Sequence, residues 1–220
     1  IGRILEAKGD LSEALSHYQT ALQGAPGFVP ARLSLARLLL RMERPGDAAL
    51  QCEAVLRSQP DNPAALLLLS AALQAQGKTA EALMRATEAV HLVPRDPNAR
   101  LQRGNVLMDQ GKAAEAEKEF REAVRLDSTL LPARTALAQA LEAQGKLDAA
   151  AEAWEEVLRV ADMPQARHAL ALLLERLGRY REAVPHYRRL LQEAPPASPR
   201  RAELQLALRR LEKRAAASAR

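Results

Sequence analysis

Apolar and polar positions alternate at helical spacing along the chain, in short runs separated by turn residues. Between 63 and 92 the apolar residues lie three or four positions apart in two runs: Leu66, Leu69 and Leu73, then Ala82, Ala86 and Ala89. This spacing places one apolar stripe along each of two helices. Gly77 suits the left-handed residue that ends the first helix, and Pro94 stops the second. The pattern predicts a helical hairpin.

The same pattern recurs every 33 or 34 residues. Five copies carry a glycine at the turn: Gly9, Gly77, Gly111, Gly145 and Gly178. All six copies place a leucine four residues before the turn position and an alanine five residues after it: Leu5, Leu39, Leu73, Leu107, Leu141 and Leu174, then Ala14, Ala48, Ala82, Ala116, Ala150 and Ala183. Glu43 replaces the turn glycine in the second copy, so we expect that turn to be altered. Because one hairpin cannot bury its apolar face alone, the copies must stack.

A helical hairpin of this length with these marks resembles the tetratricopeptide repeat (TPR) family. The resemblance implies an all-α fold, a right-handed superhelical solenoid of stacked helical hairpins with a C-terminal capping helix. We expect thirteen helices and no strand. The family's frame gives these boundaries: a truncated first repeat at 1–28, five repeats at 29–62, 63–96, 97–130, 131–163 and 164–197, a capping helix at 198–214 and a tail at 215–220.

Composition supports helices and places the net charge at one end. Ala and Leu supply 83 of the 220 residues and aromatics only 3%, which excludes a sheet-rich fold. Residues 200–220 hold seven basic and two acidic groups, whereas residues 1–199 hold 25 of each. A long basic groove for nucleic acid is therefore not expected in the body. The longest apolar run, Ala64 to Leu73, is too short to span a membrane, and no compartment can be assigned.

No residue pattern predicts catalysis, a metal site or a cofactor. Cys52 is the single cysteine and occupies a core position, while the four histidines lack paired metal-ligand spacing. Gly77-Lys78-Thr79 resembles the end of a phosphate-binding loop but follows a helix and has no glycine at 72. Carboxylate pairs such as Glu115 and Glu119 are expected on exposed helical faces. The chain is not expected to be an enzyme or to bind a small-molecule substrate.

An arginine recurs near the start of five first helices, with leucine in one copy: Arg32, Leu66, Arg100, Arg134, Arg167 and Arg201. One interpretation is structural, with each stem packed on the neighbouring hairpin and each guanidinium in solvent or on a carboxylate. The other is functional, a basic stripe for an anionic ligand. The neutral charge of the body favours the structural interpretation.

The family resemblance implies that first helices line a concave groove for a partner. Carried over position by position, the candidate groove residues are Leu33, Arg37, Leu40, Arg41, Leu67, Gln74, Leu101, Asn105, Met108 and His168. Leu33, Leu67 and Leu101 recur at the repeat period as an apolar ladder, which serves either a ligand or the consensus of the repeats themselves. No three successive copies supply the residues with which chaperone-binding members hold a C-terminal carboxylate.

The sequence therefore predicts a scaffold or adaptor that binds a partner protein's helix or extended peptide in the groove, as part of a larger assembly. Two alternatives stay open. The chain is the interaction arm of a multidomain enzyme whose catalytic domain lies outside it, or it binds RNA or another anionic partner through the Arg-rich C-terminal helix.

Overall fold

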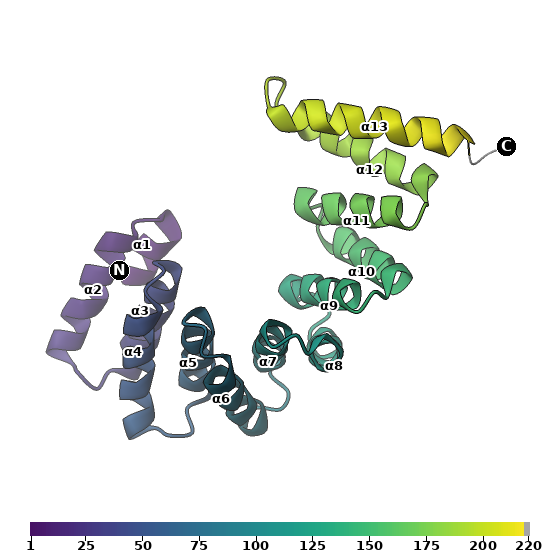
Figure 1. Cartoon of the computed structure of the whole chain (residues 1–220). Coiled ribbons are helices and arrows are strands. Elements are labelled where there is room, and N and C mark those ends of the chain that lie inside the picture. Colours follow the sequence, from purple (N-terminus) through teal and green to yellow (C-terminus); the bar gives the residue numbers. More distant parts are fainter. Residues whose placement is uncertain (218–220) are drawn as a thin grey trace. The chain divides into compact units, whose positions relative to one another are not determined.

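A computed structural model describes residues 1–217, and in this part of the chain it contains thirteen α-helices and no strand (Figure 1). The helices are α1 (Gly2–Lys8), α2 (Leu11–Gly24), α3 (Val29–Arg41), α4 (Pro45–Ser58), α5 (Pro63–Ala75), α6 (Thr79–Leu92), α7 (Pro97–Asp109), α8 (Ala113–Leu126), α9 (Leu131–Ala143), α10 (Leu147–Val160), α11 (Pro164–Arg176), α12 (Tyr180–Glu193) and α13 (Pro199–Ala217). The all-α helical repeat array expected from the sequence is confirmed.

The packing divides the chain into two compact units, Ile1–Leu126 with α1–α8 and Asp127–Arg220 with α9–α13. Within each unit, every helix packs on the helices that precede and follow it in sequence, as Figure 1 shows along the colour gradient. In the first unit, α3 also contacts α5, and α5 contacts α7. The first helices of three successive hairpins, α3, α5 and α7, therefore lie side by side in that unit.

Each unit has its own apolar core. The alanine that recurs five residues after each turn is fully buried in all six copies: Ala14, Ala48, Ala82, Ala116, Ala150 and Ala183. A methyl group at this position lets the two helices of a hairpin approach closely. Larger side chains fill the space nearby, with Phe120 completely buried and Trp154 and Tyr187 nearly so. Burial of this apolar surface is the main force that holds the stack together.

The turns that end the first helices share one backbone geometry, including the copy that lacks glycine. The five turn glycines have φ between 72° and 89°, and Glu43 has φ 57°. Arg44 N donates to Leu39 O at 2.9 Å, and Lys78 N donates to Leu73 O at the same distance in the glycine-containing copy. The expected alteration of this turn is wrong, because the packing of α3 on α4 holds Glu43 in the left-handed region that glycine normally occupies.

The last helix covers the end of the second unit. Leu204 and Leu211 of α13 are buried in the core of this unit, and Leu208 packs against it half-buried. Helix α13 extends to Ala217, so 215–217 of the predicted tail are helical, and 218–220 lie outside the described residues. No helix in residues 1–217 is long and apolar enough to cross a bilayer.

Candidate functional site

Nine of the ten predicted groove residues lie on three helices that contact one another. Leu33, Arg37, Leu40 and Arg41 belong to α3, Leu67 and Gln74 to α5, and Leu101, Asn105 and Met108 to α7. Because α5 contacts both α3 and α7, the structure brings these nine residues onto one set of adjacent helices. The tenth, His168, lies on α11 in the other unit.

The three leucines of the ladder are half-buried. In residues 1–126, none of the three belongs to the apolar cluster that contains Leu38 and Cys52 or packs against it, although some fully buried residues, such as Phe120, also lie outside that cluster. Leu40 differs, because it packs on the core. Each leucine of the ladder therefore keeps part of its side chain exposed, whereas Leu40 also packs on that cluster.

Gln74, one of the polar residues of the predicted groove, is hydrogen-bonded to the neighbouring first helix. Gln74 Nε2 donates to Asp109 Oδ2 at 2.6 Å, and Gln102 Nε2 donates to Gln74 Oε1 at 2.9 Å. Gln102 also reaches Ser70 Oγ at 3.2 Å, and the buried Ser70 hydroxyl donates to Ala82 O at 2.9 Å. Ser70 and Gln102 were not predicted, although Ser70 is the one polar interruption of the longest apolar run. These bonds fix α5 against α7 and α6.

A second type of contact recurs at equivalent places in the two units. Arg41 Nη1 lies 3.4 Å from Glu6 Oε2, and Arg210 Nη2 lies 2.7 Å from Glu175 Oε1. Both pairs join residues 35 positions apart. An aromatic residue of the following helix donates to the same carboxylates, Tyr18 to Glu6 and Tyr187 to Glu175. Burial, together with the nearby carboxylate, raises the pKa of Tyr187 to about 12, so the phenol stays a donor.

The arginine series binds backbone carbonyls near the turn that precedes its helix. The Arg32 guanidinium donates to Pro26 O at 2.7 and 2.9 Å, Arg134 Nε donates to Ser128 O at 2.7 Å, and Arg100 reaches Pro94 O at 3.3 Å. Arg201 donates to Ala194 O at 2.8 Å, and Arg167 pairs with Asp162. These guanidiniums fasten the connections between hairpins, which supports the structural interpretation.

Glu119 is not on an exposed face, which corrects the expectation from the sequence. The side chain is buried on α8 and accepts hydrogen bonds from Arg100 and Arg103, both of α7. A buried carboxylate is stable only when cations or hydrogen-bond donors compensate its charge. The guanidiniums of Arg100 and Arg103 therefore allow Glu119 to be buried. Helical periodicity alone does not show that two cations will face this position.

The remaining titratable candidates lack the features of a reactive site. Burial raises the pKa of the Cys52 thiol to about 12, so the thiol is protonated and inert at neutral pH. His168 is half-buried, and burial together with Arg200 lowers its pKa. In residues 1–217, no group of three or more His, Cys, Asp or Glu side chains is arranged to hold a metal ion.

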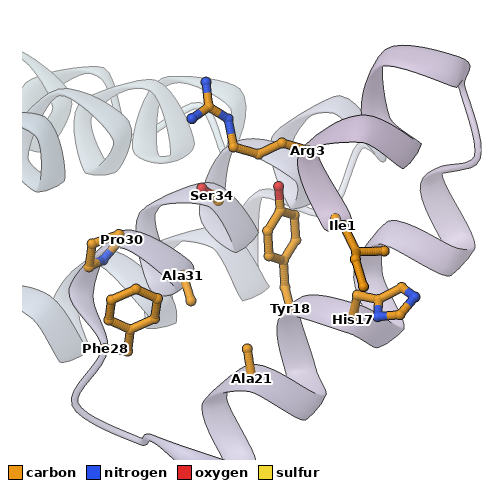
Figure 2. Close-up of a pocket in the computed structure, with 10 residues that line it drawn as sticks. Ile1, Arg3, His17, Tyr18, Ala21, Phe28, Pro30, Ala31 and Ser34 are labelled. Atoms are coloured by element: carbon orange, nitrogen blue, oxygen red, sulfur yellow. The ribbon is translucent and has the colours of Figure 1, made fainter.

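A pocket that the sequence did not predict lies between α1, α2 and α3, with a volume of about 440 Å³ (Figure 2). Figure 2 shows the rings of Tyr18 and Phe28 on either side of the methyl groups of Ala21 and Ala31. Phe28 is 52% exposed, which is unusual for a phenylalanine. The lining is largely apolar, so the pocket suits a hydrophobic side chain rather than a reaction.

Comparisons with known proteins agree with this architecture. Tetratricopeptide repeat models match residues 5–72 and residues 71–130 and 135–199. A search of curated protein sequences finds no match. In residues 1–217, the helices and the buried alanine series fit this family's hairpins.

Solved structures share the fold at low sequence identity. Pseudomonas aeruginosa pilF is 20% identical, with 94% of each chain covered and a TM-score of 0.75. A thermophilic TPR protein of Thermus thermophilus is 22% identical over 83% of this chain and 98% of that one, with a TM-score of 0.64. One chain in the crystal structure of the APC/C hetero-tetramer Cut9-Hcn1 is 19% identical to this chain. The match covers 96% of this chain and 41% of that chain, with a TM-score of 0.80.

Proteins built from these repeats are in general non-catalytic scaffolds that bind other proteins. The family models together span both units and all the hairpins of the array. The chain belongs to the tetratricopeptide repeat family and has the general character of a protein-interaction scaffold.

Proposed function

We propose that the first unit holds a helix or an extended segment of a partner protein against α3, α5 and α7. The observation that carries this proposal is the ladder of Leu33, Leu67 and Leu101, which is half-buried and lies on three first helices that contact one another. A partner's apolar side chains placed on this ladder lose contact with water, which favours binding by about 25 cal/mol per Å² of apolar area. The array then acts as a scaffold or adaptor in a larger assembly.

Polar groups beside the ladder supply directional contacts. Arg37 is exposed on α3, one helical turn from Leu33, and Asn105 is half-buried on α7, one turn from Leu101. An asparagine amide can both donate to and accept from a peptide backbone, and an arginine can hold a carboxylate with two bonds. These residues favour a peptide over a purely apolar ligand.

Membership of an assembly is supported by a similar protein. The solved structure with a TM-score of 0.80 is a hetero-tetramer, Cut9-Hcn1 of the APC/C. At 19% identity this likeness carries the fold and not the partner. The likeness supports a role within a multi-protein assembly, and the partner of this chain has to be identified by experiment.

The test begins with the proteins that co-purify with the tagged, intact protein, identified by mass spectrometry. The partner's affinity is then measured for the double variant Leu67→Glu and Leu101→Glu. Two charges placed under an apolar segment must be desolvated or must displace it, so affinity should fall by about a hundredfold or more. The melting temperature of each variant is measured alongside, so that affinities are compared between variants that remain folded.

The matched control places the same charges on apolar residues of the second helices. Leu50 of α4 and Met84 of α6 are 59% and 54% exposed. Leu50→Glu with Met84→Glu should leave affinity unchanged. Equal loss in both double variants, or unfolding of the Leu67 and Leu101 variant alone, would contradict the proposal.

A further inference from the structure

The second unit contains a pocket of about 690 Å³ that the proposed groove of the first unit does not include. The pocket lies on α11 and α13, with Glu142 of α9 at its border. His168, the predicted groove residue that stands apart from the other nine, lines it. A volume of this size accommodates several side chains of a bound segment.

The floor of this pocket is apolar. Ala169, Leu172 and Leu173 of α11 line it, and Leu172 is 43% exposed. An aliphatic side chain of a ligand would cover Leu172 and remove apolar area from water. Leu172 is therefore well suited to contact an aliphatic side chain of a ligand.

The rim of the pocket is basic. Arg176 of α11 and Arg210 and Arg214 of α13 line it, and all three side chains are exposed. Arg214 is held in place, because its guanidinium carbon lies 5.5 Å from the centre of the Tyr180 ring. This stacking leaves the edge of the guanidinium able to donate hydrogen bonds. A fixed guanidinium loses little entropy when it binds a carboxylate.

Two carboxylates also line the pocket, and both are already hydrogen-bonded. Trp154 Nε1 donates to Glu142, while Glu175 accepts from Arg210 at 2.7 Å and from Tyr187 at 3.2 Å. The positive rim therefore outweighs them. The whole unit, residues 127–220, carries sixteen Lys and Arg against twelve Asp and Glu.

We propose that this pocket, defined by Leu172, Arg176 and Arg214, binds an acidic peptide segment of a partner protein through one aliphatic side chain flanked by Asp or Glu. The aliphatic side chain lies on Leu172, and the flanking carboxylates pair with Arg176 and Arg214. Each arginine can hold a carboxylate by two parallel hydrogen bonds.

The lining disfavours RNA as the occupant. Sequence-tolerant binding of single strands relies on several aromatic side chains that stack on bases, and the residues that line this pocket supply one such ring, the half-buried imidazole of His168. The chemistry fits separate carboxylates next to an aliphatic group better than a continuous phosphate backbone.

The experiment starts with a phage library of random dodecapeptides panned on the immobilised full chain. Enriched peptides are then synthesised with a fluorescein label and titrated by fluorescence anisotropy. We expect enrichment of peptides with Leu or Ile beside Asp or Glu. The double variant Arg176→Glu and Arg214→Glu should weaken binding by about tenfold or more, since it reverses both charges that meet the carboxylates.

The control double variant is Arg181→Glu and Arg209→Glu, which makes the same charge change on exposed residues outside the pocket. It should alter affinity by about threefold or less, as a long-range charge effect screened by salt. Leu172→Glu is a second test variant that leaves the Arg214 contact with Tyr180 intact, and it should also weaken binding by about tenfold. Circular dichroism melts confirm that each variant is folded.

Three outcomes would overturn the proposal. The first is that the enriched peptides lack acidic residues. The second is that the two double variants lose the same affinity for the peptides. The third is that a labelled twelve-nucleotide oligouridylate binds more tightly than the peptides and loses affinity in the Arg176→Glu and Arg214→Glu variant. The inference goes beyond the proposed function, because it concerns another unit. The Leu67 and Leu101 variant should leave peptide binding here unchanged, so failure of one proposal is distinguishable from failure of the other.

Discussion

At the scale of single residues, two positions show how a repeat tolerates or enforces an unusual side chain. Glu43 adopts the left-handed turn conformation with φ 57°, which costs an L-residue about 1–2 kcal/mol. Gly104 of α7 faces Phe120 of α8, and a Cβ atom at 104 would overlap the phenyl ring. Glu43 therefore has a strained backbone at a position that glycine would occupy without strain. Position 104 is glycine because a larger side chain would overlap Phe120.

Glu43→Gly should therefore stabilise the protein. Relief of the left-handed strain outweighs the added freedom of the unfolded chain, for a net gain of about 1 kcal/mol in unfolding free energy. The measurement is the midpoint of urea denaturation followed by circular dichroism. Gly111→Ala, at φ 72° in a sister turn, is the matched control and should destabilise by a similar amount. A Glu43→Gly variant no more stable than the parent would show that the turn is not strained.

Gly104→Ala should destabilise the first unit by about 1–3 kcal/mol, because overpacking forces Phe120 or the backbone to move. Gly46→Ala is the control, since Gly46 lies on α4 at a place where a Cβ meets no atom within 4 Å. That change should be neutral or slightly stabilising, as alanine is the better helix former. Thermal melts of the two variants compare them directly, and equal melting temperatures would rule out the tight contact.

At the scale of elements, each hairpin relies on a neighbour to cover it. Helix α13 performs this role at the end of the second unit through Leu204 and Leu211. Its exposed residues are largely polar or charged, although Leu206 is 72% exposed. The helix is thus amphipathic, with one side for the core and one for solvent.

Deletion of 198–220 should expose the apolar surface that α13 covers and cause aggregation or loss of stability. Leu211→Ala tests the same contact with one side chain and should cost about 2–5 kcal/mol, because it leaves a cavity at a fully buried site. Leu206→Ala on the same helix is the control, with an expected change within about 0.5 kcal/mol. Denaturation of the three proteins, with light scattering for the deletion, provides the measurement. A deletion variant that stays soluble and equally stable would show that α13 does not support the array.

At the scale of the whole molecule, the chain has two separate apolar cores, one in each compact unit. Stability in repeat arrays is close to a sum of each repeat and its nearest neighbours, so damage should stay local. Leu38 and Leu173 occupy the same repeat position in the two units and are both almost fully buried.

Leu38→Ala should increase amide hydrogen exchange in α3–α5 and leave α11–α13 unchanged, while Leu173→Ala should do the reverse. Each substitution should cost about 2–5 kcal/mol, by loss of burial and formation of a cavity. Hydrogen exchange with mass spectrometry resolves the two regions. Loss of protection throughout the chain in either variant would mean that the whole array unfolds as one cooperative unit.

The repeat, the helices and much of the core could be predicted from the amino-acid pattern alone. Periodicity specifies which side of a helix is apolar, and an invariant alanine or turn glycine reports a steric requirement that is local. The Ala14 series, the turn glycines and the leucines of α13 were all predictable for this reason. The family resemblance placed nine candidate groove residues on α3, α5 and α7, and these helices lie next to one another because equivalent positions of successive repeats fall on adjacent helices. That these residues bind a partner stays a prediction.

Which polar groups meet depends on how the helices pack and could not be predicted from the pattern. The pairing of Glu6 with Arg41, of Arg134 with Ser128 O, and of Glu119 with two arginines joins groups on different segments of the chain. Periodicity indicates the side of a helix on which a residue lies, but not the distance to a donor on a neighbouring segment. The same limit applies to Glu43, whose strained turn is set by the packing of two helices and not by its own preference.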